Sequence, residues 1–151
     1  MQVRTVCQRL VFTVNATDEV VRAAQLMREK HVGYLVVVDP EKSTECARPV
    51  GVLTDRDIVV SVVARGIDPT AVRVGDIMSL NPITTQESDS MEVALRRMSQ
   101  FGVRRLPVLN DRSDLVGILA TDDILKVIAG DAQDLARTIQ TEREIEGVAR
   151  P

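Results

Sequence analysis

Residues 50–58 read VGVLTDRDI, and residues 116–124 read VGILATDDI. Residues 3–39 also align without a gap over residues 74–110, each 71 positions before its counterpart. The later match is offset by 66 positions, so the loop at residues 40–49 is five residues longer in the first copy. An internal repeat decides the architecture of a chain. The sequence therefore predicts two similar units that face each other, with any site between them present in two versions.

Apolar periodicity within each repeat predicts the order strand, helix, strand, strand, helix. The first helix of each repeat carries an apolar stripe and should run to about Lys30 or Phe101, with Thr17 and Ser88 as N-caps. Continuous apolar runs at residues 35–38 and 106–109 are typical of strands buried on both faces. Further helices are expected at residues 55–65, 122–129 and 131–147.

We therefore predict an α+β fold of two β-α-β-β-α repeats related by a pseudo-two-fold axis. Residues 1–66 would form the first repeat, residues 67–130 the linker and second repeat, and residues 131–151 a charged C-terminal helix and tail.

Composition excludes several classes of function. The net charge is −3, no run of Lys or Arg stands out, and aromatic residues make up 2% of the chain, which argues against nucleic acid and anionic membranes as partners. No apolar run approaches the roughly 20 residues that span a bilayer, and the N-terminus lacks a signal-peptide pattern. We expect a cytoplasmic protein that does not associate with membranes.

Thr54 and Asp57 place a hydroxyl and a carboxylate at one strand-to-helix corner, directly after Gly51-Val52-Leu53. One interpretation is a capping box, with Thr54 as N-cap and acidic Asp57 at the third helical position. The other is a ribose clamp, because a carboxylate accepts hydrogen bonds from two vicinal hydroxyls and the threonine hydroxyl adds one more. Spacing alone leaves both interpretations open.

Arg104 and Arg105 lead into a strand that is otherwise apolar. They are either solubilising charge at a sheet edge or a phosphate-binding pair, for which the planar fork of arginine suits the acceptor geometry. If the repeats face each other, the two arginines lie across the cleft from Thr54 and Asp57. Together the four residues would form a mononucleotide site assembled from both repeats.

The symmetry-related site is degraded in the sequence. Ala120 stands in place of Thr54, although Asp123 remains as the counterpart of Asp57. Gly33 and Tyr34 stand in place of the two arginines. We expect one occupied site per chain.

These residues resemble the tandem cystathionine β-synthase (CBS) domain pair, in its stand-alone bacterial form. The resemblance covers residues 1 to about 130 and rests on VGDIM at residues 74–78, RLPV at residues 105–108 and GVLTDRD at residues 51–57, with residues 117–119 and Asp123 as a weakened echo. It implies two units packed through their sheets, dimerisation into a flat disc, and no obligatory cofactor. It also implies an adenosyl ligand between the units, such as AMP, ADP, ATP, NAD or S-adenosylmethionine.

Carried over by motif, the resemblance assigns the ribose to Thr54 and Asp57 and the phosphate to Arg104 and Arg105. It also assigns the wall around the adenine ring to four residues, Phe12, Thr13, Val36 and Val37.

The leading hypothesis is a non-catalytic module that senses an adenine nucleotide, forms a homodimer and signals to a regulated protein that remains to be identified. The alternative is a structural dimerisation module with vestigial sites. An enzyme is disfavoured because the one histidine, His31, sits at a helix end with no nucleophile motif nearby. The paired carboxylates at residues 55, 57, 122 and 123 fall in two different corners, which also disfavours a metal site.

Overall fold

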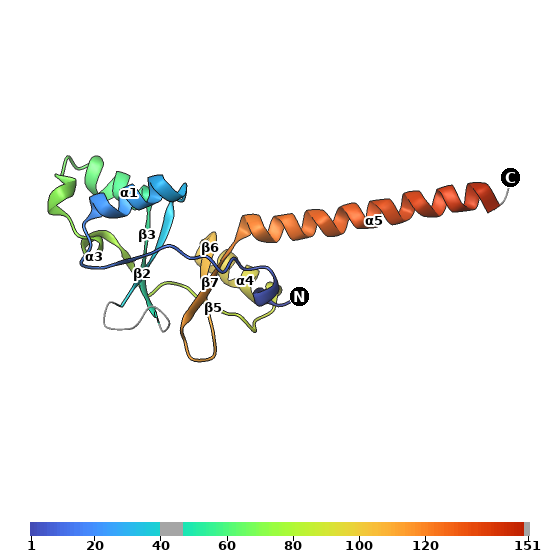
Figure 1. The fold of residues 1–151 in the computed structure, drawn as a ribbon, viewed down its shortest axis with the longest axis horizontal. Coiled ribbons are helices and arrows are strands. Elements are labelled where there is room, and N and C mark those ends of the chain that lie inside the picture. Colours follow the sequence, from blue (N-terminus) through green and yellow to red (C-terminus); the bar gives the residue numbers. More distant parts are fainter. Residues whose placement is uncertain (40–46, 150–151) are drawn as a thin grey trace.

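A computed structural model describes residues 1–39 and 47–149 of the 151-residue chain. Residues 40–46, which contain most of the longer loop predicted for the first copy, lie outside the described residues. Within the described ranges the chain forms two small mixed sheets with helices packed beside them, and one long helix that projects away from both sheets (Figure 1).

The two sheets repeat one topology, as predicted. The first contains β1 (Thr13–Asn15), β2 (Tyr34–Val38), β3 (Pro49–Thr54) and β4 (Ser79–Leu80), in that order. The second contains β5 (Thr85–Gln86), β6 (Arg105–Leu109) and β7 (Leu115–Ala120). In each sheet the first strand pairs parallel with the second, and the second pairs antiparallel with the third. Two β-α-β-β-α repeats are therefore confirmed.

Helices α1 (Val20–Lys30) and α4 (Met91–Phe101) bury most of the predicted apolar stripes, but Leu95, which belongs to the stripe predicted for α4, is exposed. Their N-caps are Glu19 and Ser90, not Thr17 and Ser88 as predicted. The helices begin later because a turn precedes each one: the Asp18 carboxylate accepts a hydrogen bond from the Asn15 N–H at 2.8 Å. An aspartate that bonds its own neighbouring backbone favours a turn over a helix. The short helical segments are η1 (Val3–Thr5), α2 (Asp55–Ile58), η3 (Val59–Val63), η4 (Pro69–Ala71) and α3 (Val74–Ile77).

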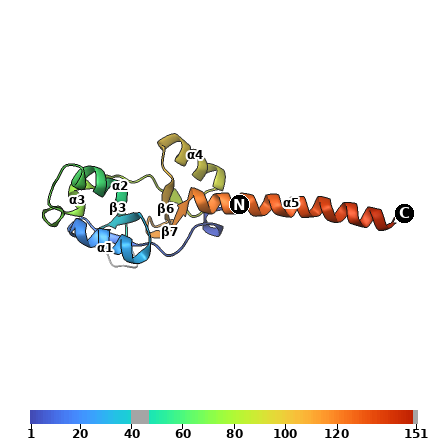
Figure 2. The same ribbon diagram turned by 90° about the horizontal axis from the view of Figure 1, so that it is seen from above.

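Helix α5 (Thr121–Ala149) is continuous, whereas the sequence predicts one helix ending at residue 129 and a second from residue 131. Gly130 lies inside it without the positive φ that Gly66 and Gly102 adopt at helix ends. A glycine inside a helix costs about 1 kcal/mol relative to alanine, which the flanking helix-forming residues tolerate. The helix runs far beyond the two sheets (Figure 2). Across the described residues, no helix combines the length and apolar character that a membrane span requires.

The two repeats exchange their leading segments. Val3 is fully buried in the core of the second repeat, beside Met98, Leu106 and Leu119. Val74 is fully buried in the core of the first repeat. Backbone hydrogen bonds follow the same symmetry, since the Val3 N–H donates to the Asp89 carbonyl and the Val74 N–H donates to the Asp18 carbonyl, both at 2.9 Å. The segment that precedes the first repeat thus completes the core of the second repeat, and the segment that precedes the second repeat completes the core of the first.

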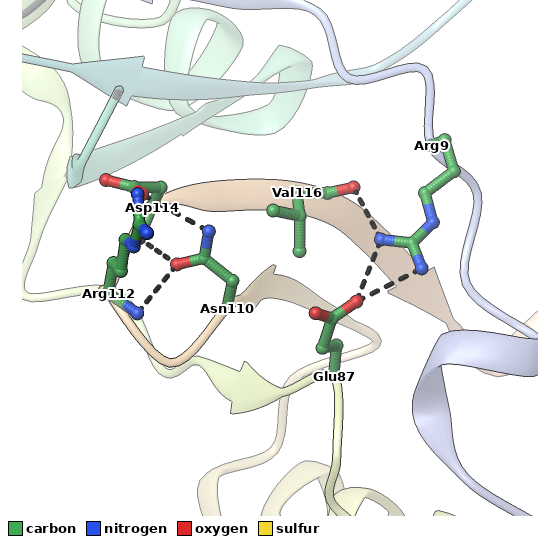
Figure 3. Close-up of polar contacts among 6 residues, drawn as sticks. All are labelled: Arg9, Glu87, Asn110, Arg112, Asp114 and Val116. Carbon is green, nitrogen blue, oxygen red and sulfur yellow. Dashed lines mark hydrogen bonds and ion pairs between the residues drawn. The ribbon is translucent and has the colours of Figure 1, made fainter. Parts of the chain in front are cut away.

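Arg9 extends this exchange across the surface of the second sheet. Both terminal nitrogens of its guanidinium donate to Glu87 Oε2 at 3.1 Å, and Nη1 also donates to the Val116 carbonyl at 3.3 Å (Figure 3). In the same view, Asn110 closes the turn between β6 and β7, because its side-chain oxygen accepts from the N–H groups of Arg112 and Asp114 at 2.9 Å. An exposed ion pair contributes at most about 1 kcal/mol, so Arg9 mainly sets the path of the N-terminal segment.

Candidate functional site

A cleft of about 610 Å³ lies between the repeats, and we call it the larger cleft. One side is the corner where β3 meets α2, which contributes Thr54 and Asp57. The other side comes from the second repeat and contributes Arg104 and Arg105. The structure therefore brings together all four polar residues that the sequence predicts for the ribose and phosphate. The other lining residues are Gly33, Tyr34, Val52, Asp55, Arg56, Ser79, Leu80, Asn81, Pro82, Ile83, Gly102 and Val103.

Thr54 and Asp57 form the capping box that one interpretation of the sequence predicts. The Asp57 N–H donates to Thr54 Oγ1 at 3.1 Å, and the Thr54 N–H donates to Asp57 Oδ2 at 2.8 Å. These bonds leave the hydroxyl hydrogen of Thr54 and the Oδ1 atom of Asp57 without a hydrogen-bond partner among the described residues. The cap therefore holds both side chains in place while each keeps one hydrogen-bonding group for a ligand.

The two arginines follow the end of α4, where Gly102 adopts the left-handed conformation with φ 65°. Arg104 Nη2 lies 3.7 Å from Asp122 Oδ1, and both side chains are more than half exposed. Such a contact is weak, so the guanidinium can turn to a stronger acceptor at little cost. The cleft thus has hydroxyl and carboxylate groups at one side and guanidinium groups at the other. This arrangement can bind a vicinal diol and an anion of the same molecule.

A second cleft of about 290 Å³ occupies the symmetry-related position, and we call it the smaller cleft. Asp123 is buried there, with 8% of its surface exposed. Its Oδ1 accepts from Gln8 Nε2 at 2.9 Å and lies 3.5 Å from Lys126 Nζ. Its Oδ2 is buried with no hydrogen-bond partner among the described residues. As the sequence predicts, Ala120, Gly33 and Tyr34 lie in this cleft.

The four residues predicted to form the adenine wall do not lie in the larger cleft. Phe12 lines the smaller cleft, Val36 and Val37 are fully buried within the first sheet, and Thr13 lines neither cleft. The four residues thus lie apart from Thr54, Asp57 and Arg104, which line the larger cleft. Since β5 pairs in parallel with β6, the residues just before β5 lie beside Arg105 at the start of β6.

Residues 80–83 therefore line the larger cleft, with Leu80, Pro82 and Ile83 giving it apolar surface, and the sequence reasoning did not single them out. They stand 71 positions after residues 9–12, so the repeat alignment contains the signal that would have found them.

Three residues line both clefts: Gly33, Tyr34 and Arg105. Tyr34 and Arg105 are counterparts in the two repeats, and the Arg105 guanidinium carbon lies 5.8 Å from the centre of the Tyr34 ring. Burial raises the pKa of the Tyr34 phenol well above its ordinary value, and the charge of Arg105 offsets only part of that effect. The phenol therefore stays neutral, and the wall between the clefts carries one positive charge.

Among the described residues, no group of three or more His, Cys, Asp or Glu side chains is placed to hold a metal ion. The carboxylates of the two corners are accordingly separated between the two clefts, with Asp55 and Asp57 in the larger and Asp122 and Asp123 in the smaller.

Two proteins of known sequence are similar to this chain over more than three quarters of its length. An uncharacterized protein of Methanopyrus kandleri is 38% identical over 127 residues, which cover 84% of this chain and 62% of that protein. This chain thus spans less than two thirds of that relative. Hypoxic response protein 1 of Mycobacterium tuberculosis is 32% identical over 116 residues, or 77% of each chain.

A CBS domain protein from Pyrobaculum aerophilum, solved in complex with AMP, matches with a TM-score of 0.73 at 26% identity and covers 82% of this chain and 89% of that chain. The family model of the CBS domain matches residues 3–64 and again residues 74–130. This chain therefore belongs to the CBS domain family and carries two copies of the domain.

Proposed function

We propose that this chain is a non-catalytic regulatory module that binds one adenine nucleotide in the larger cleft. The observation that carries the proposal is the convergence of Thr54 and Asp57 from one repeat with Arg104 and Arg105 from the other. The class of ligand is supported by the relative from Pyrobaculum aerophilum, which was solved with AMP.

Each part of the nucleotide has a matching group in this cleft. The ribose hydroxyls donate to Asp57 Oδ1, and the Thr54 hydroxyl adds a further hydrogen bond. The phosphate accepts from Arg104 and Arg105, whose forked geometry favours such acceptors. Pro82 and Ile83 offer apolar surface to the adenine ring. No obligatory cofactor enters this scheme.

Regulation follows from a site divided between the repeats. A ligand held by both repeats favours the relative arrangement in which all its contacts form. It shifts that equilibrium only by the difference between its affinities for the two arrangements. A partner protein that distinguishes the arrangements would then receive the signal.

We further propose that the module works as a homodimer that uses α5. Leu125, Ile128, Leu135 and Ile139 follow helical spacing on α5, and their exposed fractions are 61%, 54%, 65% and 47%. Isolated helices are marginal in water and are mostly stabilised by packing of an apolar face. A second copy of this chain would cover the stripe on both helices at once.

Calorimetric titration of nucleotide-stripped protein with AMP tests the proposed function, with ATP and NAD as comparators at the same salt concentration. Saturable binding of one ligand per chain is expected. Folded protein that binds none of the three would contradict the proposal and favour the alternative, a structural dimerisation module with vestigial sites.

A further inference from the structure

Helix α5 carries its apolar stripe at alternating steps of three and four residues. The stripe consists of Leu125, Ile128, Ala132, Leu135 and Ile139, and the same steps continue to Glu142 and Glu146. This spacing is typical of a helix that winds around another helix, with the stripe as the seam of the contact. All residues from 128 to 146 are exposed, and α5 projects away from both sheets (Figure 1), so the described part of the chain leaves the seam uncovered.

The two acids at the end of the seam decide how a second helix can lie on it. In a parallel pair each seam residue faces its own copy, so Glu142 would face Glu142 and Glu146 would face Glu146. Like charges placed opposite each other in a contact destabilise it. The neighbouring Arg143 would not relieve this repulsion, because in a parallel pair it faces Thr138 of the second copy. A parallel pair is therefore disfavoured.

An antiparallel pair removes these like-charge contacts. In such a pair Ile128 faces Ile139 of the second copy, and Ala132 faces Leu135, so the small alanine side chain leaves room for the larger leucine. Both glutamates then lie at the ends of the contact, where they meet uncharged residues of the second copy and remain within reach of water. The contact keeps its apolar centre and loses its repulsion.

A second row of side chains, beside the seam, has complementary charges in the same arrangement. The row consists of Asp122, Ala129, Ala136 and Arg143, which are spaced seven residues apart. In an antiparallel pair it faces the same row of the second copy in reverse order, so Ala129 faces Ala136 and Asp122 faces Arg143. Asp122 is available for this contact, because its side chain is 58% exposed and its contact with Arg104 at 3.7 Å is loose. Ion pairs at such flanking positions set the orientation of paired helices.

We propose that two copies of α5 pair antiparallel, with Ile128 against Ile139 and Asp122 against Arg143. The inference rests on the proposed homodimer and adds its orientation and register. The paired repeats of the two copies then lie at opposite ends of a shared stem about 30 Å long. The C-terminal turns of each α5 reach the repeats of the other copy, and Arg143 of one copy lies at Asp122, in the lining of the other copy's smaller cleft.

Cysteine cross-linking of the full chain distinguishes the two orientations. In a background with Cys7→Ser and Cys46→Ser, the variants Ile128→Cys and Ile139→Cys are made singly and together. Positions 128 and 139 are 11 residues apart, so in the antiparallel pair each single cysteine lies about 16 Å along the axis from its own copy. A disulfide requires Cα atoms within about 7 Å. After oxidation the double variant should therefore give a covalent dimer on a non-reducing gel, and neither single variant should.

Arg143→Glu tests the flanking ion pair. It should raise the dissociation constant of the dimer by about 2- to 30-fold, because an exposed ion pair contributes roughly 1.4- to 5-fold and the symmetric dimer contains this pair twice. Analytical ultracentrifugation over a dilution series measures the constant. Arg137→Glu makes the same change of charge at an exposed position on the side of α5 away from the seam and should leave the constant unchanged.

Three outcomes with folded protein would overturn the inference: a covalent dimer from either single cysteine variant, none from the double variant, or a dimer that Arg143→Glu leaves as stable as before. The first of these would show a parallel pair. Wild-type protein that stays monomeric would overturn the proposed homodimer as well, whereas titration with AMP tests the nucleotide site independently of the dimer. Thermal unfolding of each variant separates loss of pairing from loss of folding.

Discussion

Tyr34 and Arg105 occupy the same position in the two repeats and meet at the boundary between the clefts, with the guanidinium carbon 5.8 Å from the ring centre. A pseudo-two-fold axis brings such counterparts together, and here one is a cation and the other an aromatic ring. A cation–π contact at an exposed site contributes about 0.5–1 kcal/mol. That is weak enough for a bound phosphate to displace.

Tyr34 is the single tyrosine of a chain without tryptophan, so it reports on this wall alone. Protein labelled with 3-fluorotyrosine should give one fluorine resonance. We expect AMP to shift it, because Arg105 leaves the ring when it binds the phosphate. Arg105→Gln should already show a shifted resonance without ligand, and AMP should then change it less. A resonance that AMP leaves in place in wild-type protein would contradict movement of Arg105.

Asp57 has two roles that substitution can separate. Asp57→Asn keeps an oxygen to accept from the Thr54 N–H but loses the charge that strengthens the ribose contact. Hydrogen bonds to charged groups contribute about 1.5–3 kcal/mol, so AMP affinity should fall roughly 10- to 150-fold while thermal stability changes little. Asp57→Ala should also lose about 1 kcal/mol of stability with the cap.

Asp55→Asn is the matched control for this prediction, because Asp55 lines the same cleft but its Oδ1 accepts from the Arg56 N–H. It should not weaken AMP binding. Equal losses from Asp55→Asn and Asp57→Asn would mean that the corner acts only through its overall charge.

Arg104 should distinguish AMP from adenosine. Arg104→Gln removes a phosphate contact, so AMP affinity should fall at least about 10-fold, whereas adenosine, which lacks a phosphate, should bind as before. Calorimetric titration with both ligands measures the difference. Arg65→Gln changes an exposed arginine outside both clefts and should alter neither affinity. A parallel loss for both ligands would place Arg104 away from the phosphate.

Asp89 should make the second repeat sensitive to acid. Burial by itself raises the pKa of Asp89, but hydrogen bonds from Gln86 and Thr85 and the charge of Arg97, 2.6 Å away, outweigh it, so the pKa lies below its ordinary value. The unfolded chain therefore binds the proton more tightly. The stabilisation is complete above the unfolded pKa of about 3.9 and is lost as the pH falls through the folded value.

Melting temperatures at pH 7 and pH 3 check this sign. Asp89→Asn should lower stability by about 1–3 kcal/mol at pH 7 and should show a smaller drop between the two pH values than wild type. Glu144→Gln, on the exposed part of α5, serves as a control that should keep the wild-type drop. An undiminished drop in Asp89→Asn would assign the acid sensitivity to other carboxylates.

Leu135 tests the proposed homodimer. Leu135→Glu places a charge in the middle of the exposed apolar stripe of α5 and should shift the protein from dimer to monomer, as measured by light scattering during gel filtration. Gln133→Glu adds the same charge about 200° around the helix and should leave the dimer intact. A wild-type monomer at micromolar concentration would contradict the role proposed for α5.

Much of the candidate site was predictable because its signals are local. Thr54 and Asp57 are three residues apart at a strand end, and Arg104 and Arg105 follow a helix end, so spacing alone places each pair. The two-fold repeat then places the pairs opposite each other. The apolar lining of the larger cleft needed one further step, because Phe12 and Ile83 are counterparts in the repeat alignment and only the packing of the two repeats shows that Ile83, not Phe12, lines the cleft that contains Thr54 and Asp57.

The duplicated fold, the order of strands and helices, and the loss of three polar groups from the smaller cleft were all predictable, since they depend on periodicity and on comparison of one repeat with the other. In contrast, it took the folded structure to show that Val3 completes the core of the second repeat and Val74 that of the first. The two valines are identical counterparts with the same local preferences, so the choice of core belongs to long-range packing. Packing also brought Tyr34 against Arg105, a contact between residues 71 positions apart that no local pattern specifies.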